Sequence, residues 1–262
     1  MMLYKYCAIN DYLRASLTEQ YVWFSSPDAF NDINDSGLRL DDRYTDEDIR
    51  REFEFQLYLS RTLPMQPAVS PLELEAAARS LFSSVLADRG PDGRPDHSGR
   101  LHASVVEALK IRRQSIGISS FSQDSHNELL WAHYGGAHYG VCLGFETSLD
   151  NHCFQQIEPV KYVDVLPKIK LLSHMGGNLV ELYTTKGSAW SYEREVRAFQ
   201  HASGAHPVDP RCLVNVVFGE RAGGSDSDEI SRLVRDKYGP RVGLLQASHG
   251  EDGALALRAV SG

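Results

Sequence analysis

Short apolar segments separated by polar turn residues open the chain, and their spacing predicts a strand, a helix and a second strand in that order. Leu3–Cys7 is the first predicted strand, and Asp11–Leu17 is a short helix whose apolar residues recur at helical spacing. Tyr21–Phe24 is the second strand, and it ends at Ser25–Pro27 because serine and proline favour turns.

The pattern becomes helical over residues 41–113. Three amphipathic helices are predicted at Asp46–Arg61, Ser70–Ala87 and Arg100–Arg113. The second begins with serine, proline and a nearby glutamate, which together are a helix-start signal. Glycine and proline between the second and third helices predict an exposed loop at Arg89–Asp96. We interpret residues 41–113 as a helical insertion.

The rest of the chain is mostly β in pattern. One late helix, Ser225–Tyr238, has acidic residues in its first turn, where the helix dipole favours them, and glycine after its last turn. We expect an α+β protein of a single domain over residues 1–262, with a mainly antiparallel sheet. The predicted strands are Ser115–Ser122, Gly140–Glu146, Ile157–Val163, Glu195–Gln200, Val214–Phe218, Val242–Gln246 and Ala254–Arg258.

Composition and net charge restrict the class of protein and its cellular location. The hydrophobic share of 42% fits a folded core, and a net charge of −8 argues against non-specific nucleic-acid binding, which needs clustered lysine and arginine. The chain has no apolar signal-peptide stretch after its first residues and no run near the ~20 residues that span a bilayer. Its 4 cysteines have no C-x-x-C spacing, which indicates reduced thiols. These features predict a cytoplasmic protein without a membrane partner.

Familiar catalytic and metal motifs are missing from the sequence. There is no G-x-S-x-G elbow, no P-loop and no G-x-G-x-x-G fingerprint. The calcium-like run that begins at Asp32 has Arg43 where a ligating glutamate belongs, and His133 and His138 are poorly spaced to share a metal. We therefore predict no metal site.

Five segments carry a resemblance to a known family. In order and spacing they resemble the hallmark segments of the bacterial domain-of-unknown-function family 2971. One departure is that Ile33 and Asn34 stand where the family usually continues with proline, which predicts a slightly altered turn. The segments are Leu3–Tyr6, Trp23–Asp32, Phe121–Ser122 with Leu130–Tyr134, Gly140–Phe145 and Lys186–Arg197.

The opening unit is also similar to the start of the ADP-ribosyltransferase fold, which implies a split, mainly antiparallel sheet with the helical insertion added to it. In that fold a basic side chain of the first strand reaches NAD, and Lys5 occupies that place. Ser120–Ser122 is similar to the Ser-x-Ser of the Arg-Ser-Glu class, and Glu193–Glu195 to its Glu-x-Glu. The class has arginine where this chain has lysine, and lysine lacks the planar fork that binds two phosphate oxygens.

The resemblance implies a set of residue roles for the cleavage of NAD. Breaking the nicotinamide–ribose bond develops an oxocarbenium-like cation, which a fixed carboxylate at Glu195 would stabilise. Glu193, expected two residues earlier on the same extended face, would orient the nucleophile. Ser122 and Tyr134 complete the predicted catalytic set. The predicted cofactor-binding residues, which supply a cation for the pyrophosphate, a wall for the nicotinamide and flanking contacts, are Lys5, Tyr6, Ser120, Phe121, His133, Lys186 and Trp190.

Ordinary structural roles explain the same residues in a different way. Glu193, Glu195 and Arg197 alternate as a solvated strand face would, and Glu195 and Arg197 would also suit a structural ion pair. The serines could cap the helix expected from Asn127 to Tyr134. Lys5 would then be a surface residue, and Phe30 and Trp131 are interpreted as core residues.

We expect an NAD-dependent ADP-ribosyltransferase or NAD glycohydrolase, with NAD as substrate and an unknown macromolecular acceptor or water, in a toxin or phage-defence role. The alternative is a non-catalytic binding or regulatory module of the same fold. The NAD hypothesis requires that Lys5, Ser122 and Glu195 line one cleft. If Glu195 points to the opposite side of the sheet from Lys5, the NAD hypothesis is wrong.

Overall fold

The structure is a computed structural model. It describes residues 1–32, 34–36, 116–168 and 175–260, together with isolated positions between 41 and 114. The chain divides into two compact units, one of residues 1–35, 114–164 and 186–262, the other of residues 36–113 and 165–185. Most of the predicted helical insertion, including the loop at 89–96, lies outside the described residues, so the single domain with an insertion stays a prediction.

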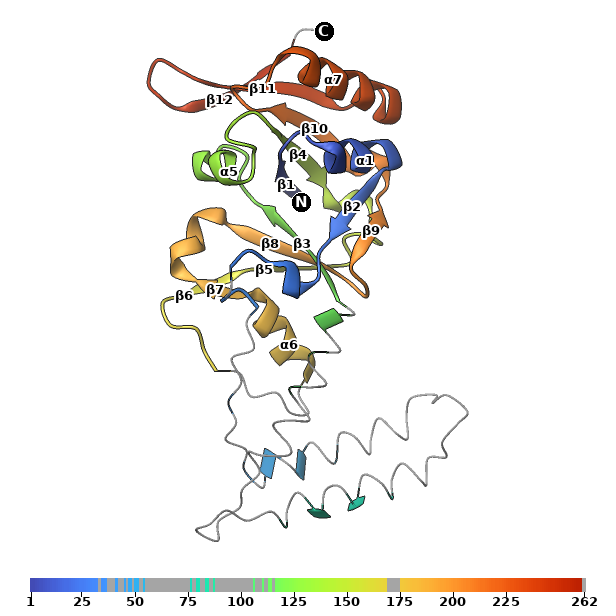
Figure 1. The fold of residues 1–262 in the computed structure, drawn as a ribbon, viewed down its shortest axis with the longest axis vertical. Coiled ribbons are helices and arrows are strands. Elements are labelled where there is room, and N and C mark those ends of the chain that lie inside the picture. Colours follow the sequence, from blue (N-terminus) through green and yellow to red (C-terminus); the bar gives the residue numbers. More distant parts are fainter. Residues whose placement is uncertain are drawn as a thin grey trace. The chain divides into compact units, whose positions relative to one another are not determined.

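The first unit is built on an eight-stranded sheet with the order β12-β11-β10-β4-β1-β3-β8-β5. All neighbouring strands are antiparallel except β10 and β11, which confirms an α+β protein with a mainly antiparallel sheet (Figure 1). The strands are β1 (Met2–Cys7), β3 (Gly117–Ser122), β4 (Val141–Glu146), β5 (Gln156–Pro159), β8 (Glu195–Gln200), β10 (Leu213–Phe218), β11 (Gly243–His249) and β12 (Leu255–Ala259).

Two small sheets accompany the main one. One joins β2 (Tyr21–Phe24) to β9 (Gly204–Pro207), and the other joins β6 (Lys161–Val163) to β7 (Thr185–Gly187). The single strand predicted over residues 157–163 is wrong, because the chain leaves the main sheet after β5 and resumes as β6. The Val160 N–H between them donates to the Glu195 carbonyl at 2.9 Å.

The helices begin where the sequence supplies a cap. In α1 (Asp11–Glu19) the Asn10 side chain accepts from the Leu13 N–H at 3.0 Å, and Asn127 caps α5 (Glu128–His133) in the same way. The long helix α7 (Gly224–Tyr238) ends at Gly239, whose φ of 80° suits glycine, and it links the parallel strands β10 and β11. The second unit contains α6 (Met175–Thr184). The 3₁₀ turns are η1 (Pro27–Ala29), η2 (Thr147–Leu149), η3 (Ser188–Glu193) and η4 (Pro210–Cys212).

The main sheet has a different core on each face. On one face α1 and α7 bury their apolar sides, including Leu13 and Val234, against Leu3 and Leu143 of the strands. On the other face Trp131 of α5, which is fully buried, packs against a smaller cluster that includes Cys142. In Figure 1, α5 and α1 lie on opposite sides of β1 and β4. Each face is therefore closed by a helix, and the side chains of β1 alternate between the two cores.

The sheet opens between β1 and β3. All six residues of β1 pair with β4, but only Tyr4 pairs with β3, opposite Ser122. Beyond this pair the two strands lose their register, and the polar groups of β3 need other partners. This opening positions the site described below.

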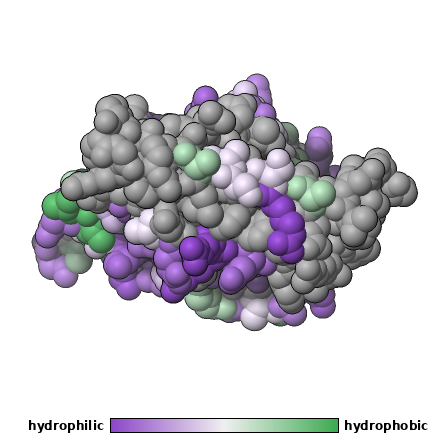
Figure 2. Space-filling model, turned by 90° about the horizontal axis from the view of Figure 1, so that it is seen from below, coloured by the Kyte–Doolittle hydropathy of each residue, from purple (hydrophilic) through white to green (hydrophobic). Residues whose placement is uncertain are grey.

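No helix among the described residues is long and apolar enough to cross a membrane. On the face shown in Figure 2, the described residues that are visible are mainly hydrophilic, with a few hydrophobic groups between them. The four cysteines are free thiols in the structure.

Candidate functional site

Glu193 and Glu195 are brought together by a turn and not by a strand. Glu193 ends η3, Arg194 takes a left-handed conformation with a φ of 45°, and Glu195 begins β8. The prediction that both glutamates lie on one extended segment is therefore wrong. Both carboxylates nevertheless reach a common partner.

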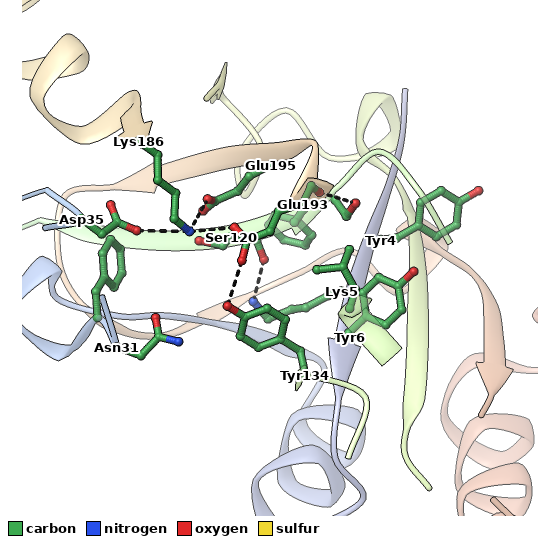
Figure 3. Close-up of a pocket in the computed structure, with 14 residues that line it drawn as sticks. Tyr4, Lys5, Tyr6, Asn31, Asp35, Ser120, Tyr134, Lys186, Glu193 and Glu195 are labelled. Atoms are coloured by element: carbon green, nitrogen blue, oxygen red, sulfur yellow. Dashed lines mark hydrogen bonds and ion pairs between the residues drawn. The ribbon is translucent and has the colours of Figure 1, made fainter. Parts of the chain in front are cut away.

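That partner is the ammonium group of Lys186. Its Nζ lies 2.7 Å from Glu193 Oε2, 3.2 Å from Glu195 Oε2 and 3.5 Å from a carboxylate oxygen of Asp35 (Figure 3). The ring of Trp190 covers the ammonium, with its centroid 4.7 Å from Nζ. Three carboxylates around one lysine leave an excess of negative charge, which a second cation reduces.

Arg197 is that second cation. Its Nε donates to Glu195 Oε1 at 2.8 Å, and its Nη2 donates to Asp35 Oδ2 at 2.6 Å. The side chains of Arg197, Asp35 and Glu195 are only 1%, 4% and 5% exposed. The interpretation of Glu193, Glu195 and Arg197 as a solvated strand face is therefore wrong, because these residues form a buried ion network. Such groups are tolerated in a protein interior only when their charges and hydrogen bonds are paired.

The network shifts the pKa values of the two glutamates in opposite directions. Burial alone would raise the pKa of Glu195, but Arg197 outweighs burial and, with help from Lys186, lowers that pKa to about 2. Burial raises the pKa of Glu193, and the neighbouring charge of Glu195 adds to the rise, against the opposing effect of Lys186. Glu195 therefore stays ionised at neutral pH, whereas Glu193 is the member of the pair that binds a proton more readily than an ordinary glutamate.

Tyr134 and Ser122 hold Glu193 in place. The Tyr134 hydroxyl donates to Glu193 Oε1 at 2.9 Å, and burial raises the pKa of Tyr134 to about 12, so this group is a stable donor. The Ser122 hydroxyl donates to the Glu193 carbonyl at 2.7 Å and accepts from the Asp124 N–H at 3.0 Å. Ser122 therefore positions the turn, and Asn127 caps α5 instead of a serine.

Lys5 reaches the site through the opening between β1 and β3. Its ammonium donates to the Ser119 hydroxyl at 2.9 Å and to the Ser120 carbonyl at 3.1 Å, and it lies 5.0 Å from the ring centroid of Phe121. Burial lowers the pKa of Lys5. No carboxylate among the described residues lies within salt-bridge distance of this ammonium.

The strand pairing places Lys5 and Glu195 on opposite faces of the sheet. Tyr4 pairs with Ser122, and Ser122 pairs with Glu195, so these three side chains share one face. Lys5 is the next residue of β1 and leaves the strand on the other face, which counts against a single binding face. The opening allows its side chain to line the same pocket as Ser122 and Glu195 all the same.

A pocket of about 200 Å³ connects these groups. Nine of the eleven predicted site residues line it, and His133 and Trp190 do not, since His133 is exposed at the end of α5 and Trp190 lies behind Lys186. The other residues that line it were not predicted as site residues and are Tyr4, Phe30, Asn31, Asp35 and Leu130. Phe30 lies against the Arg197 guanidinium, 5.0 Å from ring centroid to Cζ, and is only partly buried.

The arrangement suits an organic ligand with a positive centre better than it suits a metal ion. No group of three His, Cys, Asp or Glu side chains in the described part of the chain is arranged to hold a metal. The carboxylates already have Lys186 and Arg197 as cationic partners. What the pocket offers is a fixed negative carboxylate, a protonatable one beside it, and a separate buried cation.

Residues 130–198 match the family described as a protein of unknown function (DUF2971). The matched region contains two of the five segments that carry the resemblance, Gly140–Phe145 and Lys186–Arg197, and the Leu130–Tyr134 part of a third. The comparisons with curated proteins and with solved structures gave no match.

Proposed function

We propose that this protein cleaves NAD, either by transferring ADP-ribose to an acceptor or by hydrolysis. The observation that supports this most is the glutamate pair, because opposite pKa shifts in adjacent carboxylates divide the roles of fixed charge and proton acceptor between them. Both carboxylates line one pocket with the buried cation Lys5. A role as a toxin or phage-defence effector in the bacterial cytoplasm accompanies this proposal.

In the proposed reaction the bond between nicotinamide nitrogen and ribose C1′ breaks, and its electron pair goes to the nicotinamide. The positive charge that develops on the ribose is stabilised by Glu195, whose carboxylate stays ionised because Arg197 pairs with it. Water or an acceptor hydroxyl then adds to C1′ and gives its proton to Glu193. Tyr134 orients Glu193 for this step through its hydrogen bond.

The two pocket lysines have different roles in this proposal. Lys186 is committed to three carboxylates, so it holds the glutamate pair and is a poor partner for phosphate. Lys5 has no carboxylate partner among the described residues and is the better partner for the pyrophosphate. Because a single ammonium replaces the planar fork of an arginine, the pyrophosphate is bound through one point charge.

A non-catalytic binding or regulatory module is the second candidate, and one observation favours it. Both carboxylate oxygens of Glu195 already have cationic partners, since Oε1 accepts from Arg197 Nε at 2.8 Å and Oε2 lies 3.2 Å from Lys186 Nζ. A glutamate held in this way would equally serve as one member of a structural ion pair. The two candidates differ in whether NAD is consumed.

Glu193→Gln separates the two candidates. Because burial already favours the neutral form of Glu193, glutamine should preserve the fold while removing the proton acceptor. If the protein cleaves NAD, nicotinamide release should fall on the order of 10²-fold, with little change in NAD affinity. Glu251→Gln, at an exposed carboxylate outside the pocket, is the matched control.

Glu195→Gln is the second variant, and it carries a different risk. Because Glu195 is buried in the ion network, the substitution should destabilise the fold. Its activity is therefore compared only after circular dichroism shows a folded protein. Full nicotinamide release by a folded Glu193→Gln or Glu195→Gln protein would refute the proposed roles.

A further inference from the structure

A second, larger cavity adjoins the glutamate pocket. It has a volume of about 530 Å³, and both cavities are lined by Lys5, Tyr6 and Tyr134. These three residues lie at the end of the glutamate pocket away from Asp35 (Figure 3). The second cavity lies over the α1 side of the sheet, because its lining includes Leu13 of α1 and Leu143 of β4.

The lining of this cavity is apolar inside and aromatic at its edge. Leu13, Val22 and Phe145 are buried core residues that form part of its wall. Tyr12 and Trp23 also line it, yet they are 82% and 53% exposed. Large aromatic side chains exposed beside an apolar cavity provide flat surfaces on which a planar ring can stack.

Lys5 marks the junction of the two cavities and is available to an anion. An ammonium group has three N–H donors, and the described residues accept only two of them, at Ser119 and Ser120. Burial lowers the pKa of Lys5, and a bound anion would favour its charged form. The junction therefore favours a negative group next to an aromatic one.

We propose that the apolar cavity binds the base of a nucleoside diphosphate, whose phosphates contact Lys5. This inference rests on the proposed function, because the far end of the same dinucleotide would then reach the glutamate pair. Charge supports the direction of binding: phosphates are repelled by Glu193 and Glu195, whereas ribose hydroxyls can donate to these carboxylates. A fatty acid would also match an apolar cavity with one cation, but the exposed rings of Tyr12 and Trp23 favour a planar group.

ADP binding to the intact protein tests this inference, because ADP contains the base and the phosphates but no nicotinamide bond. The heat of binding is measured for the wild type, Trp23→Ala and Lys5→Met, and the change in tryptophan emission is measured for the wild type and Lys5→Met. We expect ADP to quench the fluorescence of the wild type and Trp23→Ala to weaken ADP binding on the order of 10-fold or more. Lys5→Met should weaken the binding of ADP and leave the binding of adenosine nearly unchanged. Tyr139→Ala, at an exposed aromatic that lines neither cavity, should bind ADP normally.

The results distinguish this inference from the proposed function. ADP binding that depends on Trp23, in a protein that releases no nicotinamide from NAD, would support the nucleotide site and refute the cleavage. Nicotinamide release with an unchanged KM in Trp23→Ala would support the cleavage and overturn this site. Absence of ADP binding, or displacement of ADP by palmitate at equal affinity, would also overturn it.

Discussion

Lys186→Met removes the one cation that contacts all three acidic side chains of the buried network. Lys186 is 5% exposed, and Asp35, Glu193 and Glu195 lie 3.5, 2.7 and 3.2 Å from its ammonium. Removing one partner of a buried ion pair typically costs about 3–5 kcal/mol, because the remaining charges stay buried without compensation. Methionine keeps most of the volume, so the loss should come from the charge and not from a cavity.

Thermal unfolding measures the effect of Lys186→Met. Each kcal/mol moves the Tm of a domain of this size by roughly 2–4 °C, so we expect a drop of roughly 6–20 °C near neutral pH. Lys161→Met, at an exposed lysine of β6, is the control and should leave the Tm nearly unchanged.

The pH dependence of this variant provides a second check. Without Lys186 the pKa of Glu193, already raised by burial, should rise further. A carboxyl whose folded pKa exceeds its unfolded pKa stabilises the fold at low pH and loses that contribution as pH rises through the folded pKa. The Tm deficit of the variant should therefore be larger at about pH 8 than at about pH 5. An equal deficit at both pH values, or no deficit, would refute the account of Lys186 as the centre of a charged network.

Three further predictions concern other residues of the buried network and its hydrogen-bond partners. In urea titrations the free energy of unfolding of the wild type should fall by on the order of 3 kcal/mol between pH 4.5 and about pH 2, because Glu195, whose pKa is lowered, stabilises the fold only while it is ionised. Glu195→Gln should show no such loss. Tyr134→Phe should cost about 1.5–3 kcal/mol in urea unfolding, because it removes a donor to a buried carboxylate, whereas exposed Tyr139→Phe should cost almost nothing. Asp35→Asn should lower the Tm by several degrees, because the lost pairing with Lys186 and Arg197 costs roughly 3 kcal/mol. The control Asp164→Asn, at an exposed position, should leave the Tm unchanged, and an unchanged Tm in Asp35→Asn would contradict the network.

The strands were predictable from the sequence because their alternation is local. Glu195–Gln200 has the predicted bounds, and Leu3–Cys7 and Gly140–Glu146 differ from the observed strands by one residue. The edge strand Gly204–Pro207 was missed, since four residues with glycine and proline at the ends show no alternation. The turn at Glu193 was also missed, because nothing in the local pattern marks the left-handed Arg194.

The composition of the site could be predicted only in part. The family segments contain the two glutamates, Ser122 and Lys5, so these residues could be proposed from the sequence. The pairing of Asp35 with Arg197 joins positions 162 residues apart, and no sequence pattern links them. The one local signal is that Asp35 follows the Trp23–Asp32 segment, in a run that resembles the front of a calcium loop. The buried character of Arg197 likewise depends on neighbouring strands and not on its own segment.

The most direct test of the central claim is NAD consumption by the purified wild-type protein, followed as free nicotinamide by liquid chromatography. We expect nicotinamide to appear in proportion to protein and time, and to fall on the order of 10²-fold in Glu193→Gln while Glu251→Gln matches the wild type. A folded wild-type protein that binds NAD but releases no nicotinamide, with or without added acceptor proteins, would contradict NAD cleavage and favour the binding module.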